Sequence, residues 1–144
     1  MRWLNYYIKL LINLIVSIDH LVLTVKDINK TVDFYCNILG MKYEEFKLSK
    51  DFNTRKCIKF GKQKINLHEY DNLIIPGAKL PRPGTADICF ISEIDILEWK
   101  NIFIKNSINI EYGPTDQVGA DGKLRSIYVR DPDENLIEIA NKVN

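Results

Sequence analysis

The sequence predicts an α+β fold in which one βαβββ pattern occurs twice, preceded by a helix. Three observations lead to this prediction. A strand, a helix and three further strands follow one another in an order that repeats after about 70 residues. Apolar residues alternate with polar ones in the strands, whereas in the helices they recur every three or four positions. The 144 residues, 46% hydrophobic and 27% charged, fit one domain of ordinary size with a substantial core.

The first copy of the pattern is expected to span residues 17–75. It opens with the β-rich run at 18–25, after which Asp27 offers an N-cap to a helix that Gly40 ends. One face of this helix carries four apolar residues: Ile28, Val32, Tyr35 and Leu39. The remaining strands of the first copy are expected near 42–48, 54–60 and 63–70.

The second copy is expected to span residues 85–142. It follows a connector at 71–84 that is too rich in proline and glycine to hold a regular element. Its first strand is predicted at 85–92, and Ile96, Trp99 and Phe103 mark one face of its helix. The last three strands are expected near 108–113, 124–130 and 135–140. The final pair is joined by residues 131–135, which have the composition of a plain turn.

Residues 1–16 predict an amphipathic N-terminal helix, because Asn5, Lys9 and Asn13 form one polar stripe on an otherwise apolar helix. The segment is shorter than the roughly 20 residues that a membrane span needs. We expect it to dock against the domain or at a subunit interface. An interfacial membrane helix and a start-site artefact remain as alternatives.

Charge and cysteine content limit the partners and the setting. The formal net charge is +1 and no basic stripe stands out, so nucleic acid is not expected as a partner. A membrane partner is not expected either. The three cysteines are widely spaced and include no C-x-x-C pair, which argues against a disulfide framework and against a cysteine zinc site. We therefore expect a cytoplasmic protein.

A curved sheet with a helix on its outer face has a concave inner face still to be filled. Two such modules, 17–75 and 85–142, are predicted to pair into an open barrel around a cavity. Strand alternation places His20, Asn66 and His68 on the cavity side of the first module, opposite the apolar residues of the same strands. The same argument places Glu138 on the cavity side of the second.

Glu138 needs a partner, because a carboxylate on the covered face of a sheet is costly to desolvate alone. With His20 and His68, the only histidines, it forms a set that Fe(II), Mn(II), Ni(II) or Zn(II) accepts with positions open for substrate. The alternatives are structural histidines and an ion pair between Glu138 and a basic residue, namely Arg125, Arg130 or Lys64. Cys89 is interpreted as a small buried hydrophobe.

Several of these segments resemble one family. Residues 18–25, followed by 33–35 and 39–41, are similar to the opening of the vicinal oxygen chelate superfamily, which includes glyoxalase I, bleomycin-resistance proteins and extradiol dioxygenases. Residues 128–138 resemble the other signature of that superfamily. The similarity covers about residues 17–142. Between the two signatures, residues 63–69 and 87–89 resemble the small glyoxalase domain-containing proteins of type 5.

This resemblance implies a glyoxalase-like fold and a divalent metal held by the first and last strands of each module. His20 matches the ligand on the first strand. Glu138 matches the carboxylate on the last strand, where it would both bind the metal and shuttle a proton as the catalytic residue. Asn66 stands where the family carries Glu or Gln, and Asp87 where it carries His. The expected metal ligands are His20, His68, Glu138 and Asp87.

The resemblance also implies a metal-dependent enzyme, either a lyase or isomerase of glyoxalase type or a dioxygenase, that acts on a small oxygenated substrate. We expect a homodimer. The candidate substrate-binding residues are Asn66, Arg55, Arg125 and Tyr128. The alternative is a metal-free protein that binds a small molecule, as bleomycin-resistance proteins do, and a third possibility is a structural partner that acts through its N-terminal helix.

Overall fold

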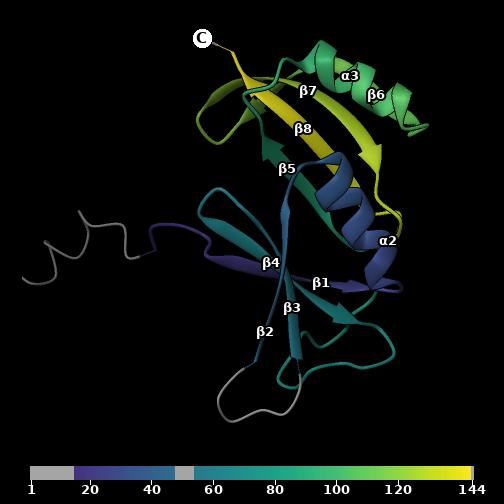
Figure 1. Ribbon diagram of the computed structural model, residues 1–144. Coiled ribbons are helices and arrows are strands. Elements are labelled where there is room, and N and C mark those ends of the chain that lie inside the picture. The colour runs from purple at the N-terminus through teal and green to yellow at the C-terminus, as the bar shows by residue number, and fades with distance from the viewer. Residues whose placement is uncertain (1–14, 48–53, 144) are drawn as a thin grey trace, which may run out of the picture.

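The computed structural model describes residues 15–47 and 54–143, which form two four-stranded sheets with a few helical segments (Figure 1). The predicted α+β class with two βαβββ units is confirmed. The predicted N-terminal helix lies outside the described residues except for Ile15 and Val16, which are exposed and have no regular structure.

The first sheet has the strand order β1-β4-β3-β2. β1 runs parallel to β4, and the other neighbours are antiparallel. The elements of this unit are β1 (His20–Val25), α2 (Ile28–Val32), η1 (Asp33–Ile38), β2 (Lys42–Lys47), β3 (Thr54–Phe60) and β4 (Gln63–Glu69).

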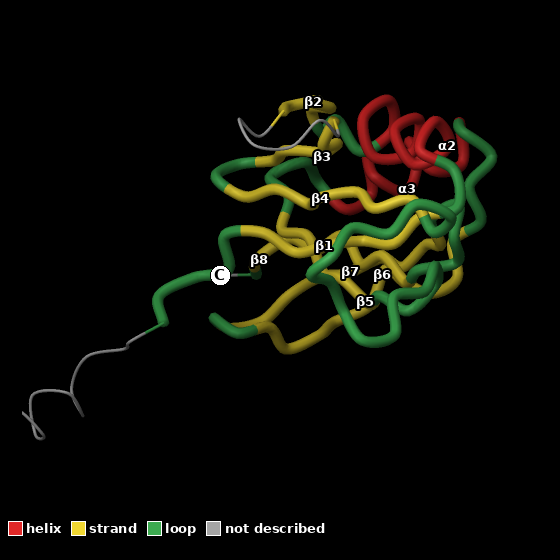
Figure 2. The backbone as a smooth tube through the Cα atoms, turned by 90° about the horizontal axis from the view of Figure 1, so that it is seen from below, coloured by secondary structure: helices red, strands yellow, loops and turns green. Residues whose placement is uncertain are grey.

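The second sheet repeats this topology with the order β5-β8-β7-β6. Here β5 runs parallel to β8. Its elements are β5 (Asp87–Ile91), α3 (Ile96–Lys105), β6 (Ile110–Gly119), β7 (Gly122–Arg130) and β8 (Leu136–Lys142). In Figure 1, α3 packs along this sheet, and Figure 2 shows that α2 and α3 gather at one side of the molecule.

Two elements differ from their sequence-based prediction. The single helix expected after Asp27 is an α-helix for one turn and then a π-helix, in which the Leu39 N–H donates to the Phe34 carbonyl five residues back. This wider turn buries both Phe34 and Tyr35. The strand expected near 108–113 continues to Gly119, because a bulge after Tyr112 absorbs the irregular backbone and pairing with β7 resumes.

Each sheet buries one face and leaves the other open. On β4 the buried face carries Ile65 and Leu67, and on β8 it carries Ile137 and Ile139, all at most 3% exposed. The predicted strand alternation is therefore correct for both strands. Aromatic rings join the buried faces of the two units: Phe90 of β5 packs edge-on against Phe60 and Tyr35, with centroids 5.2 and 6.4 Å apart.

The turn at residues 131–135 is more than a connection between β7 and β8. The Asp131 carboxylate is buried and accepts a hydrogen bond from the Tyr35 hydroxyl at 2.8 Å. Asp133, also buried, accepts from the Lys26 backbone N–H at 3.2 Å. The Asn135 side chain accepts from the Ala86 N–H at 2.8 Å. The turn of the second unit thereby fixes the first unit against it.

No helix in the described ranges is long and apolar enough to span a membrane. The cytoplasmic location stays a prediction.

The buried bond between Tyr35 and Asp131 predicts a measurable loss of stability on its removal. Tyr35→Phe should lower the free energy of unfolding by about 1–3 kcal/mol, because a buried carboxylate loses a donor. Urea unfolding measures the difference. The matched control is Tyr43→Phe, which removes an exposed hydroxyl bond to Glu45 and should cost less than about 0.5 kcal/mol. Equal losses for the two variants would contradict the role given to the turn.

Candidate functional site

The open face of the first sheet forms the floor of a pocket of about 390 Å³. β1 contributes His20 and Val22, and β4 contributes the row Lys64, Asn66 and His68. The connector after β4 supplies an apolar wall. The other lining residues are Phe46, Arg55, Lys56, Leu67, Ile74 and Pro76. The structure thus brings four of the predicted residues, His20, Asn66, His68 and Arg55, to one pocket.

His20 is oriented for a ligand. Its Nδ1 lies 2.7 Å from a carboxylate oxygen of Asp19, and because a carboxylate only accepts, Nδ1 carries the proton. The lone pair of Nε2 is then available. The imidazole is 44% exposed, so a ligand can approach it. A carboxylate behind the ring is the arrangement that orients metal-binding histidines.

Asn66 lies diagonally across from His20, since Val22 is its direct partner on β1. Its Oδ1 is buried and has no hydrogen-bond partner among the described residues. Buried polar atoms are nearly always satisfied, so an orphaned acceptor at the floor of a pocket calls for a water molecule or a ligand as its partner. A donor hydrogen or a cation would satisfy this atom.

His68 is not close to His20. It pairs with Thr24, four positions along β1 from His20, which corresponds to about 13 Å along the strand. Its neighbour is Arg55, and burial together with this positive charge lowers the pKa of His68. The structure therefore places His68 beside Arg55 rather than in one coordination sphere with His20.

The open face of the second sheet carries Glu138 in a separate pocket of about 430 Å³. Cys89 of β5 and Tyr128 of β7 are the register partners of Glu138 on either side. Partial desolvation of the thiol against its neighbours, and then the charge of Glu138, raise the pKa of Cys89 to about 12. Burial and a hydrogen bond to Glu138 raise the pKa of Tyr128 to about 12. Both groups stay protonated and can donate to the carboxylate.

Two expectations about this face change. Cys89 is exposed rather than buried, because it lies on the open face of β5. The guanidinium of Arg125 pairs with Asp116 at 2.8 Å, and that of Arg130 pairs with Glu111. Neither arginine forms an ion pair with Glu138 among the described residues, so the alternative in which one of these arginines pairs with Glu138 is not supported.

The internal repeat places two pairs of donors at equivalent positions. In the first sheet, His20 lies two residues before Val22, and Val22 pairs with Asn66. In the second, Asp87 lies two residues before Cys89, and Cys89 pairs with Glu138. We call His20 with Asn66 the first donor pair, and Asp87 with Glu138 the second donor pair.

The two donor pairs do not meet within one chain. The pocket of each is lined by residues of its own unit alone. Across residues 15–47 and 54–143, no group of three or more His, Cys, Asp or Glu side chains is placed to hold a metal ion. Each pair supplies two ligands, fewer than the three or more protein ligands of most transition-metal sites. The donor chemistry, one imidazole and three oxygens over both pairs, suits a divalent metal only if the pairs are combined.

Comparison with known proteins identifies the family. Residues 17–139 match the glyoxalase/bleomycin resistance protein/dioxygenase superfamily. The chain therefore belongs to this superfamily, the one that the sequence motifs resemble. A solved structure of an integron cassette protein from the mobile metagenome of Vibrio cholerae has a TM-score of 0.84 at 40% identity. The match covers 92% of this chain and 99% of that one.

Two relatives show the range within the family. Virulence protein STM3117 of Salmonella typhimurium is 46% identical over 126 residues, which cover 88% of this chain and 84% of the relative. The metallothiol transferase FosB of Staphylococcus epidermidis is 30% identical over 125 residues, which cover 87% and 81%. The name of the Salmonella protein states a biological role, and that of the Staphylococcus protein states a reaction.

Sequence reasoning missed the partnership of Cys89 and Tyr128 with Glu138. The signal was available, because strand alternation puts Cys89 on the same face as Asp87, and a tyrosine two strands away from it belongs to that face as well.

The orphaned oxygen of Asn66 predicts an unusual stability effect. Asn66→Ala should change the free energy of unfolding by less than about 0.5 kcal/mol, because the side chain makes no bond that folding would lose. Asn135→Ala is the control: its amide bonds both Asp131 and Ala86, and its removal should cost about 2 kcal/mol or more. Thermal or urea unfolding of both variants checks this. A large loss for Asn66→Ala would make it a structural residue.

Proposed function

We propose that this protein is a metal-dependent enzyme of the vicinal oxygen chelate type, in which a second copy of the chain completes the active site. The observation that carries the proposal is the equivalent placement of the two donor pairs. Each pair stands on the open face of its sheet, each is too small to hold a metal ion, and together they offer one nitrogen and three oxygens.

A homodimer in which the first sheet of one chain faces the second sheet of its partner brings the donor pairs together twice. The charges of the two pockets favour this pairing. In the described residues, no acidic side chain lines the first pocket, whereas Glu138 lines the second, where Asp121 and Lys142 neutralise each other in an ion pair at 2.9 Å. Opposite charge on facing surfaces steers and orients association.

The chemistry follows from the residues at the junction. A divalent metal bound there would act as a Lewis acid on neighbouring oxygens of a small substrate. Glu138 is the candidate base that takes a proton from the substrate. The Cys89 thiol and Tyr128 hydroxyl hold its carboxylate in place from both flanking strands. The candidate metals are Ni, Zn, Mn and Fe, and the reaction is that of a glyoxalase-type lyase or isomerase, or of a dioxygenase if the metal is iron. The kinship with type 5 glyoxalase domain-containing proteins is part of this proposal.

The alternative is a metal-free protein that binds a small molecule. Asn66 and Asp87, the two departures from the family's ligand pattern, favour it. His20→Ala separates the two functions, because ligand binding would survive this change in a sequestering protein and be lost with the metal in an enzyme.

Metal content tests the leading proposal. Protein purified without chelators and reconstituted with each metal should hold one ion per chain by elemental analysis. His20→Gln and Glu138→Gln should each weaken metal binding by more than about tenfold. Substitution of a residue that only hydrogen-bonds a metal ligand already causes a loss of that size, so loss of the ligand itself should cost at least as much. The control Glu111→Gln removes an exposed carboxylate bonded to Arg130 and should leave metal content unchanged. Wild-type protein that retains no stoichiometric metal would overturn the proposal.

Mixing two defective variants tests whether copies share the site. His20→Ala and Glu138→Ala each lack metal when alone. If the donor pairs come from different chains, a mixture refolded together forms heterodimers in which one of the two sites carries no substitution. Metal content should then recover to about one quarter of the wild-type value. No recovery, in a mixture shown by light scattering to be dimeric, would mean that each chain builds its own site.

A further inference from the structure

The pocket on the first sheet has a chemical character that neither donor pair explains. Its described lining contains five basic or imidazole side chains and no acidic one: His20, Arg55, Lys56, Lys64 and His68. Three of them are already engaged: Asp19 bonds His20 at 2.7 Å, Glu69 bonds Lys56 at 3.1 Å, and Arg55 has an interaction of its own. The positive charge that faces the pocket is therefore carried chiefly by Lys64, with the imidazole of His68 as a further hydrogen-bond donor.

The Lys64 ammonium is directed toward Arg55 and His68. It lies over the Phe46 ring, 4.7 Å from the centroid, and not over the residues that pair with Lys64 on the neighbouring strands. Phe46 pairs with Arg55 on β3, and the register of β3 with β4 puts Arg55 beside His68. An aromatic face holds the ammonium without neutralising it, because the attraction comes from the ring quadrupole. Lys64 forms no ion pair with any described residue within 4.0 Å, and Asp19, on which its charge acts, is engaged by His20.

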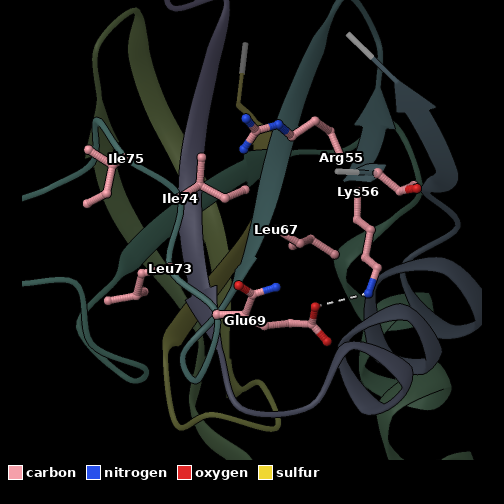
Figure 3. Close-up of a pocket in the computed structure, with 9 residues that line it drawn as sticks. Arg55, Lys56, Leu67, Glu69, Leu73, Ile74 and Ile75 are labelled. Carbon is pink, nitrogen blue, oxygen red and sulfur yellow. Dashed lines mark hydrogen bonds and ion pairs between the residues drawn. The ribbon is translucent and has the colours of Figure 1, made fainter. Parts of the chain in front are cut away.

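An apolar wall stands opposite this charge. The connector after β4 contributes Ile74 and Pro76 to the pocket, and Val22 and Phe46 continue the apolar surface across the sheet. In the adjoining pocket of about 180 Å³, Figure 3 shows Ile74 turned toward Arg55, whereas Leu73 and Ile75 point away from that residue. The side chain of Ile74 thus lies on the side of the connector that faces Arg55.

The geometry points to a substrate that carries an anionic group on an apolar body. The anion, a carboxylate or a phosphonate, binds Lys64 and His68 near Arg55, and the apolar body packs between Ile74, Pro76 and Phe46. Charge-assisted bonds to an ammonium are the strong ones, and they gain strength in a pocket walled by apolar groups. This inference names the substrate class of the proposed function. It rests on the proposed function in one respect, that this pocket is the substrate site.

The test uses three probes that share a phenylalkyl body and carry an anionic, a neutral or a cationic head group: 4-phenylbutyrate, 4-phenylbutanol and 4-phenylbutylamine. They are titrated by calorimetry into the full-length protein in the presence of EDTA. The butyrate should bind at least about tenfold more tightly than the alcohol, as expected for one bond to a charged group, and the amine should bind most weakly. Acetate, which lacks the apolar body, should bind more weakly than the butyrate.

Two matched pairs of variants locate the binding. Lys64→Gln should weaken butyrate binding about tenfold. Lys59→Gln should have no effect, because Lys59 is the register neighbour of Lys64 but bonds Glu44 outside the pocket. Ile74→Ser should weaken the butyrate and the alcohol alike, whereas Leu80→Ser, on an exposed residue of the same connector, should affect neither.

Equal binding of the butyrate and the amine, or equal effects of Lys64→Gln and Lys59→Gln, would overturn the inference. These outcomes are separable from failure of the proposed function. Because EDTA is present, anion binding is measured without metal, so a protein that holds no metal can still pass this test. A protein that holds metal but binds no anion keeps the proposed function and loses only this substrate class.

Discussion

The buried carboxylate of Asp131 is the interaction on which the arrangement of the two units depends. It accepts hydrogen bonds from the Tyr35 hydroxyl, from the backbone N–H groups of Asp133 and Asn135, and from the Asn135 amide, all between 2.8 and 2.9 Å. A buried charge is tolerated when its lone pairs are satisfied in this way. The bonds shape the turn between β7 and β8 and at the same time attach it to the helical segment of the first unit.

With the buried faces of the sheets joined through this turn and the ring of Phe90, both open faces remain available for other contacts. The internal repeat determines the positions of the donor side chains as well as the fold. It places His20 with Asn66, and Asp87 with Glu138, at the same register positions of two different surfaces. In the proposed function, half of a ligand set lies on each surface, which accounts for the lack of a complete metal site among the described residues.

The two faces have nevertheless become different. The first is basic and is bordered by an apolar connector, whereas the second surrounds one carboxylate with a thiol and a phenol that keep their protons. A substrate between such faces meets a charge that holds it on one side and a base on the other. In the proposed function, the duplicated fold therefore separates substrate binding from proton transfer.

The sequence alone predicted the class of fold and the core-facing sides of β4 and β8, because periodicity and alternation depend only on local order, but it misplaced Cys89 of β5, which was expected to be buried and is exposed. It also selected His20 and Glu138 through family motifs. Only the tertiary structure decided that His68 lies about 13 Å along the strand from His20, since strand register is a long-range property. It likewise made Asp131 a buried hub rather than a plain turn residue, because the partner that satisfies its charge, Tyr35, is 96 positions away in the chain.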